Sequence, residues 1–237
     1  MTMKNNELET KSELQEESLF KGSLGRRSFL QYAGASAAGI ALVAAGCRKD
    51  RGVENVMTGA TLDFKDDFGV LNYAYALEQL EAAFYVKVAS APPSGFSTVE
   101  KAYFQDIQFH EIAHREFFKN ALSTAAIGSL EVDFSSINFS DRTSVLNAAM
   151  AFEDLGVGAY NGAGIRISNP TYLLLAGKIV SVEARHAAYI RDLVSPGSFA
   201  SAPQVATATA LDMALAPDVV LAAAGNFIKT KINVINL

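Results

Sequence analysis

The sequence predicts an all-α fold, a four-helix bundle with a long crossover between helices 2 and 3 and an added C-terminal helical segment. Half of the 237 residues are apolar, and they recur at three- and four-residue steps over four long stretches, as in amphipathic helices. Pro and Gly stand mostly between these stretches. The connection over residues 124–139 is long for a compact domain, and a bundle with a crossover between its second and third helices explains it.

The boundaries of the four helices follow from local capping signals. Ser97 and Glu100 form a capping box, in which each side chain satisfies a free backbone N–H at the start of the second helix. Ser140 or Asp141 caps the third helix, and Asn169 followed by Pro170 begins the fourth. The helices are therefore expected over residues 67–90, 97–123, 140–167 and 169–194.

The segment 195–237 is expected to be a C-terminal helical extension with one or two shorter helices, one of which starts at Pro217. Its side chains at Leu211, Val220 and Phe227 are too apolar to remain in water. We therefore expect it to pack on the bundle or to form a subunit interface, away from the candidate ligands. A homodimer is one form that such an interface would take.

The first 46 residues have the pattern of an export signal. Arg26 and Arg27 are followed by Ser28–Gln31 and then by the fifteen-residue uncharged stretch Tyr32–Gly46, which ends before Cys47. This stretch is shorter than the roughly 20 residues of a membrane-spanning helix and suits the apolar core of a signal peptide. The arginine pair resembles a twin-arginine signal, and the small residues before Cys47 resemble a lipoprotein cleavage box.

These resemblances imply a protein of the periplasm or cell envelope, anchored to the membrane by lipidation of Cys47. Residues 47–66 show no periodicity and are expected to be a flexible tether before the bundle, which is assigned to 67–194. The alternatives for the N-terminal segment are a buried helix or an uncleaved anchor.

Composition excludes some partners. The formal net charge is −5 and the expected bundle, residues 67–194, carries no cluster of Lys and Arg, so nucleic-acid binding is not expected. Cys47 is the single cysteine, which excludes a disulfide within the chain.

The chemistry is carried by two Glu-x-x-His motifs on alternate helices. Glu111 and His114 lie on the second helix, and Glu183 and His186 lie on the fourth. Residues three apart share a helix face, so each pair can bind one metal ion or bridge to a second ion. One such motif is weak evidence, whereas two on alternate helices of one bundle are unlike a chance arrangement.

The first and third helices each contribute a lone glutamate within an apolar run, Glu78 and Glu153. A buried carboxylate is costly unless it is paired or bound to a metal. The lone glutamate precedes the motif glutamate by a similar distance in both halves: 33 residues from Glu78 to Glu111 and 30 from Glu153 to Glu183. A tyrosine also stands seven residues after each lone glutamate, Tyr85 after Glu78 and Tyr160 after Glu153. The two helix pairs therefore look like equivalent halves.

In these ligands the chain resembles the ferritin-like di-iron or di-manganese carboxylate proteins. The stretches LEQLEAAFY and EARHAAYIRDL are similar to the bacterial ferritin-like proteins called desiccation-related. The resemblance implies a centre of two iron or manganese ions in which Glu111 and Glu183 bridge both ions. It makes Glu78 and Glu153 terminal ligands, and His114 and His186 complete one ion each.

The chain departs from this pattern at the residue before each Glu-x-x-His. Many relatives carry an acidic residue there that orients the opposite histidine, whereas this chain has His110 and Val182. Asp106 and Asp154 are the candidate replacements, and His110 itself is expected at the surface or behind a ligand.

Two neighbouring residue types need a separate interpretation. Glu81 lies one turn after Glu78 and is its rival as a ligand, but the spacing to the tyrosines favours Glu78. We expect Glu81 to be solvated or to make a polar contact between helices. Tyr85 and Tyr160 are expected to be core aromatics with bonded hydroxyls, or redox participants as the alternative.

These observations predict an exported ferritin-like protein with redox chemistry toward oxygen or peroxide, or with a role in metal handling. Whether it is an enzyme stays open, because no substrate is indicated. The alternative is an envelope stress or desiccation-related structural protein whose metal site is vestigial.

Overall fold

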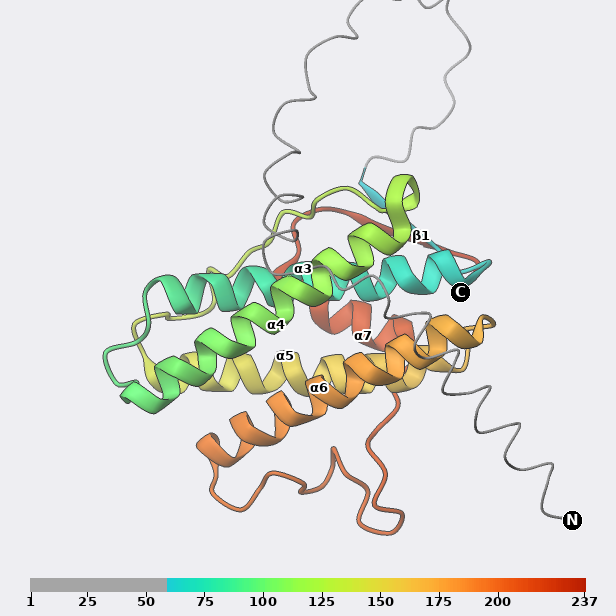
Figure 1. The fold of residues 1–237 in the computed structure, drawn as a ribbon. Coiled ribbons are helices and arrows are strands. Elements are labelled where there is room, and N and C mark those ends of the chain that lie inside the picture. The colour runs from blue at the N-terminus through green and yellow to red at the C-terminus, as the bar shows by residue number, and fades with distance from the viewer. Residues whose placement is uncertain (1–58) are drawn as a thin grey trace, which may run out of the picture. The chain divides into compact units, whose positions relative to one another are not determined.

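The computed structural model describes residues 59–237, so the predicted signal segment 1–46 and Cys47 lie outside the described residues. Four long helices dominate the described part, and the predicted all-α bundle is confirmed (Figure 1). Helix α3 packs mainly on α4, and α5 packs mainly on α6. The bounds are α3 (Asp67–Ser90), α4 (Thr98–Leu122), α5 (Arg142–Gly164) and α6 (Pro170–Val194).

The helix starts have the caps that the sequence indicates. The Ser97 hydroxyl accepts a hydrogen bond from the Glu100 N–H, and a Glu100 carboxylate oxygen accepts one from the Ser97 N–H, at 3.1 and 2.7 Å. Asp141 caps α5, and Asn169 caps α6 before Pro170. Each cap satisfies backbone N–H groups that lack a partner within the helix.

The connection from α4 to α5 returns along α3, as the predicted crossover requires (Figure 1). Two polar residues of α3, seven positions apart, hold it. Asn72 donates to the carbonyl of Ala125 at 2.9 Å and accepts from the N–H of Ile127 at 2.8 Å. Gln79 accepts from the N–H of Leu130 at 2.8 Å. The side-chain amides of Asn72 and Gln79 thus satisfy backbone N–H and C=O groups of the crossover that water cannot reach.

The predicted tether is wrong for its last residues. Ala60–Asp63 form strand β1, which pairs in parallel with β2 (Ile232–Ile235), with Ala60 opposite Ile232. Leu62 in β1 has a fully buried side chain. A four-residue strand has little local pattern of its own, and its partner lies at the opposite end of the chain. The sequence therefore offered no local signal for it.

The C-terminal extension lies against α5. It contains one short helix, α7 (Pro217–Ala224), followed by a 3₁₀ turn, η3 (Gly225–Phe227), and by β2. The helix begins at Pro217 as expected, but strand β2 stands where a purely helical segment was predicted. Val220 is fully buried, and the ring of Phe227 lies 4.8 Å from that of Phe152 on α5.

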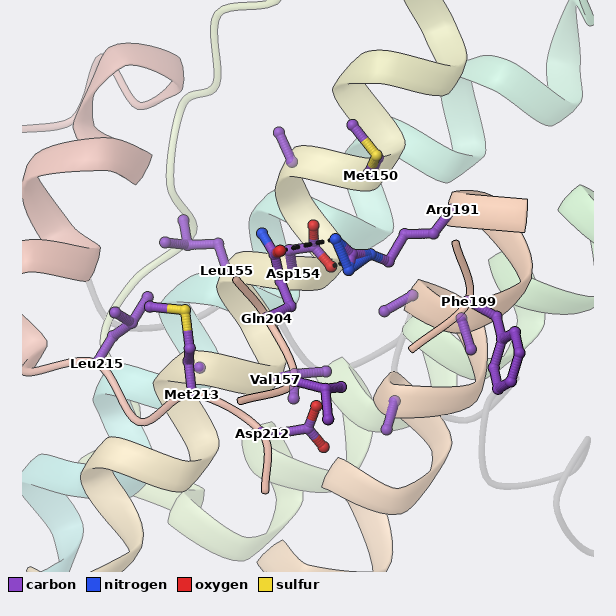
Figure 2. A pocket seen from close by; sticks show the side chains of 16 residues that line it. Met150, Asp154, Leu155, Val157, Arg191, Phe199, Gln204, Asp212, Met213 and Leu215 are labelled. Atoms are coloured by element: carbon purple, nitrogen blue, oxygen red, sulfur yellow. Dashed lines mark hydrogen bonds and ion pairs between the residues drawn. The ribbon is translucent and has the colours of Figure 1, made fainter. Parts of the chain in front are cut away.

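The extension also lines an open pocket of about 380 Å³ with the outer faces of α5 and α6 (Figure 2). On its wall Arg191 forms an ion pair with Asp154 at 3.4 Å and donates to the side-chain oxygen of Gln204 at 2.7 Å. Arg191, near the end of α6, thus binds both the middle of α5 and the extension.

None of the helices within residues 59–237 combines the length and the apolar character that crossing a bilayer requires.

Two glycines test how closely the extension packs on the bundle. A Cβ atom on Gly162 of α5 would lie 1.8 Å from the carbonyl oxygen of Leu215, whereas one on Gly177 of α6 would meet nothing. We predict that Gly162→Ala lowers the free energy of unfolding by about 1–3 kcal/mol, the usual result of overpacking. The control Gly177→Ala should raise it by up to about 1 kcal/mol through helix propensity.

Thermal unfolding of the two variants beside the wild type measures both effects. A Gly162→Ala protein as stable as the Gly177→Ala protein would contradict the close packing of the extension on α5.

Candidate metal centre

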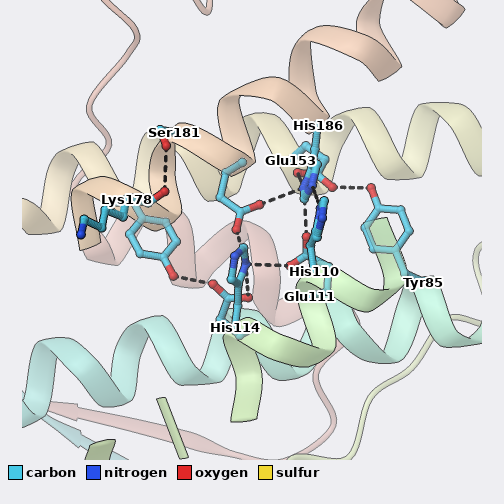
Figure 3. A network of polar contacts seen from close by, with 11 residues as sticks. Tyr85, His110, Glu111, His114, Glu153, Lys178, Ser181 and His186 are labelled. Carbon is cyan, nitrogen blue, oxygen red and sulfur yellow. Dashed lines mark hydrogen bonds and ion pairs between the residues drawn. The ribbon is translucent and has the colours of Figure 1, made fainter. Parts of the chain in front are cut away.

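The six predicted ligands converge at the centre of the bundle (Figure 3). Each helix contributes from its inner face. The four glutamates have at most 1% of their surface exposed, His186 has 5% exposed, and the His114 side chain 13%. The residues are Glu78 on α3, Glu111 and His114 on α4, Glu153 on α5, and Glu183 and His186 on α6.

Both histidines direct the Nδ1 atom at the carboxylates. His114 Nδ1 lies 2.7 Å from Glu183 and 3.6 Å from Glu78. His186 Nδ1 lies 3.0 Å from Glu111 and 3.4 Å from Glu153. Each histidine is therefore closest to the Glu-x-x-His glutamate of the other helix pair and also contacts the lone glutamate of its own pair.

The ligand atoms form two overlapping groups of four. One group is made by Glu78, Glu111, His114 and Glu183, and the other by Glu111, Glu153, Glu183 and His186. Within each group, the potential ligand atoms lie within 4.8 Å of one another. Glu111 and Glu183 belong to both groups, which is the arrangement that the bridging role requires.

The chemistry of the donor atoms fits a cation. Ten buried side-chain nitrogen and oxygen atoms in the described residues lack a hydrogen bond, and eight of them belong to the six predicted ligands. They include both carboxylate oxygens of Glu111 and Glu183 and the Nδ1 atoms of both histidines. Buried polar groups are almost always hydrogen-bonded, whereas these atoms contact one another without the alignment of hydrogen bonds, so their concentration at one point fits a site for metal ions.

Burial and mutual contact shift the acidities of these groups. Burial raises the pKa of Glu111 well above its usual value, and it raises that of Glu153 to about 7. Burial acts in the same direction on Glu183, but contacts with both histidines outweigh it and lower its pKa to about 2. Burial disfavours charged imidazoles, yet the surrounding carboxylates raise the pKa of His114 and His186 to about 12. Protons on the histidines and on part of the glutamates therefore offset the negative charge of the carboxylates, and bound cations would do the same.

The two tyrosines connect the halves of the bundle crosswise. The Tyr85 hydroxyl on α3 donates to Oε1 of Glu153 on α5, and the Tyr160 hydroxyl on α5 donates to Oε1 of Glu78 on α3. Each tyrosine shares a helix face with the glutamate seven residues before it, but its hydroxyl reaches the other glutamate. The Oε2 atoms of Glu78 and Glu153 remain unsatisfied, so each lone glutamate has one oxygen directed at the cluster.

Glu81 is a fifth buried carboxylate, so the expected solvation of this residue is wrong. It is 4% exposed, and burial followed by the neighbouring glutamates raises its pKa well above the usual value. Its Oε1 lies 2.9 Å from the position that a Cβ atom on Gly156 would occupy. Gly156 follows Glu153 by three residues, as Glu81 follows Glu78, so the two positions are equivalent in the two halves of the bundle. Because Gly156 has no side chain, the carboxylate of Glu81 has room beside α5.

His110 lies behind a ligand, one of the two places that the sequence allowed for it. Its Nδ1 lies 2.9 Å from Nε2 of His186, and the two rings are nearly parallel. His110 therefore occupies the role for which Asp106 and Asp154 were candidates. Asp154 instead pairs with Arg191 on the outer face of the bundle. The preceding position in the other motif is Val182, which has no polar side-chain atom.

A four-helix bundle with interior carboxylates and two Glu-x-x-His motifs is characteristic of the carboxylate metal proteins of ferritin-like fold. The sequence model of the Ferritin-like domain family matches residues 66–196, which is more than half of the chain. The chain belongs to this family. No curated protein matches it in a sequence search.

The crosswise tyrosines give a direct test of the site's architecture. Tyr85→Phe and Tyr160→Phe each leave a buried carboxylate oxygen without its donor, at a cost of about 1–3 kcal/mol. We predict a fall in melting temperature of about 2–4 °C per kcal/mol for each. Tyr73→Phe is the matched control, because the buried Tyr73 hydroxyl has no hydrogen bond and its loss should not destabilise the protein.

Thermal unfolding of the three variants makes the comparison. Equal stability of Tyr85→Phe, Tyr160→Phe and Tyr73→Phe would mean that the crosswise hydrogen bonds do not contribute to the fold.

Proposed function

We propose that this protein binds two iron or manganese ions in the six-residue site and acts in redox chemistry toward oxygen or peroxide, or in metal handling. The observation that carries the proposal is the set of eight unsatisfied ligand atoms in two overlapping groups that share Glu111 and Glu183. Carboxylate oxygens with one imidazole per ion suit either metal. Bound ions of this kind would supply electron transfer to and from a small oxidant.

The protein's own residues would hold and shape such a centre. Glu111 and Glu183 would bridge the ions, Glu78 and Glu153 would each offer one oxygen, and one Nδ1 atom would complete each ion. Tyr85 and Tyr160 keep the lone glutamates in place, and burial raises the pKa of both hydroxyls well above the usual value, which keeps them donors.

A cleft of about 260 Å³ between α4 and α6 supports access for a small oxidant. His186 forms part of its lining together with His110 and Tyr189. Molecules of the size of oxygen or peroxide fit in this volume, and through it they would approach the His186 side of the cluster. The remainder of the lining consists of Tyr103, Asp106, Ile107, Val182 and Arg185.

The alternative function is that of a stress or desiccation-related structural protein whose site is vestigial. A vestigial site would be expected to lose ligands, because buried unpaired carboxylates destabilise a fold unless something compensates them. The presence of all six residues, each directed at the same point, favours a working metal centre.

Metal titration tests the proposal. The wild-type chain should bind two Fe²⁺ or two Mn²⁺ ions, as determined by elemental analysis after removal of loosely bound metal. Glu111→Gln and Glu183→Gln should lose both ions, since each removes a bridge while preserving side-chain shape. Glu116→Gln on the same α4 helix is the control, because Glu116 is only partly buried, lies outside the six-residue site and pairs with Arg115.

The apparent affinity should also rise with pH. His114 and His186 carry protons in the absence of a cation, since their pKa values are about 12, and metal binding must displace these protons. A wild-type chain that binds neither iron nor manganese would support the vestigial alternative.

We further propose that the protein is exported to the periplasm or cell envelope and anchored there by a lipid on Cys47. Arg26 and Arg27 before the uncharged stretch support this proposal. Replacing both arginines with lysine should leave the precursor in the cytoplasm, which fractionation followed by immunoblotting detects. Replacing Lys21 with arginine serves as the control. Unchanged export of the double lysine variant would exclude the twin-arginine route.

A further inference from the structure

We propose that His110 is a positioning residue that makes the two metal positions unequal, so that the position at His186 fills before the one at His114. This inference rests on the proposed dinuclear site. It concerns a contact outside the six ligands, and the six ligands themselves are arranged alike in the two halves of the bundle.

The geometry around His186 assigns a role to each of its ring nitrogens. Nδ1 lies 3.0–3.4 Å from Glu111, Glu153 and Glu183, on the side of the cluster. Nε2 points the other way and lies 2.9 Å from Nδ1 of His110. With a metal ion on Nδ1, the imidazole proton resides on Nε2 and is donated to His110 Nδ1. His110 then carries its own proton on Nε2.

The two rings meet edge to edge and lie nearly in one plane. The ring centroids of His110 and His186 are 5.1 Å apart and the ring planes differ by 9°. The hydrogen bond fixes the tautomer of His186, and its in-plane direction fixes the orientation of the His186 ring. Figure 3 shows His110 beside His186.

His114 has no equivalent support. The residue that corresponds to His110 in the other helix pair is Val182, which also directly precedes a Glu-x-x-His motif. Within residues 59–237, the ion pairs of His114 all involve its Nδ1 atom. The Nδ1 atom of His114 contacts three carboxylates, as that of His186 does. The two metal positions therefore differ in what faces the Nε2 side of each histidine, not in the ligands themselves.

Hydrogen-bond acceptors behind a ligating imidazole increase its basicity and fix its orientation, and their loss typically costs 10–100-fold in metal affinity. The His186 position should therefore bind its ion about 10–100-fold more tightly than the His114 position. Binding of two ions should occur in two resolved steps. His110 is exposed at the surface, so substitutions there leave the core intact.

The test is a titration of the full-length chain with Co²⁺, followed by visible absorption and calorimetry. His110→Phe keeps a planar ring but removes the acceptor, and it should weaken the first step by about 10–100-fold while leaving the second unchanged. His110→Asn is the conservative variant, because the asparagine Oδ1 takes the place of His Nδ1. It should restore two resolved steps.

The converse variant, Val182→His, offers an acceptor to His114 and should tighten the second step alone, with Val182→Leu as its control. A wild-type chain that binds two Co²⁺ ions with equal affinity would overturn the inference, as would unchanged constants in His110→Phe. Either result leaves the proposed function intact, whereas a wild-type chain that binds no Co²⁺, Fe²⁺ or Mn²⁺ would remove both.

Discussion

Four glutamate side chains meet at the centre of this bundle almost without contact with water, and the need to neutralise them constrains the rest of the structure. An isolated buried carboxylate is too costly to retain its charge. Two imidazoles face the four carboxylates from α4 and α6, and two tyrosine hydroxyls bind the lone glutamates from α3 and α5. These groups leave eight ligand atoms without a hydrogen bond, which is the strongest reason to assign cations to the site.

The same constraint explains both the symmetry of the bundle and its two departures from symmetry. Each helix pair supplies one glutamate, one Glu-x-x-His motif and one tyrosine, so the helices must hold these side chains in matching register. The hydrogen bonds from the two tyrosines to the lone glutamates connect α3 directly to α5. The departures are Glu81, which fits against Gly156, and His110, which contacts His186 where Val182 offers nothing to His114. Both distinguish one half of the centre from the other.

The bundle and its convergent residues were predictable because their signals are local and repeated. Helix starts follow from capping residues such as Asp141 and Asn169, and helical periodicity places Glu111 and His114 on one face. Strand β1 could not be predicted, because its partner β2 lies about 170 residues later in the chain and neither strand has a pattern of its own. The contact of His110 depends on how α4 approaches α6, and no spacing within one helix reveals it. The burial of Glu81 had one signal, the glycine at the equivalent position 156.

The central claim is that two metal ions lie between the carboxylates of this bundle, and a crystal structure of the iron- or manganese-loaded protein tests it most directly. Anomalous diffraction at the absorption edge of the metal should show two peaks about 3.5–4 Å apart. One peak should lie beside Nδ1 of His114 and the other beside Nδ1 of His186, with Glu111 and Glu183 in contact with both. A map with no anomalous peak among these residues, or with metal only at the protein surface, would contradict the account.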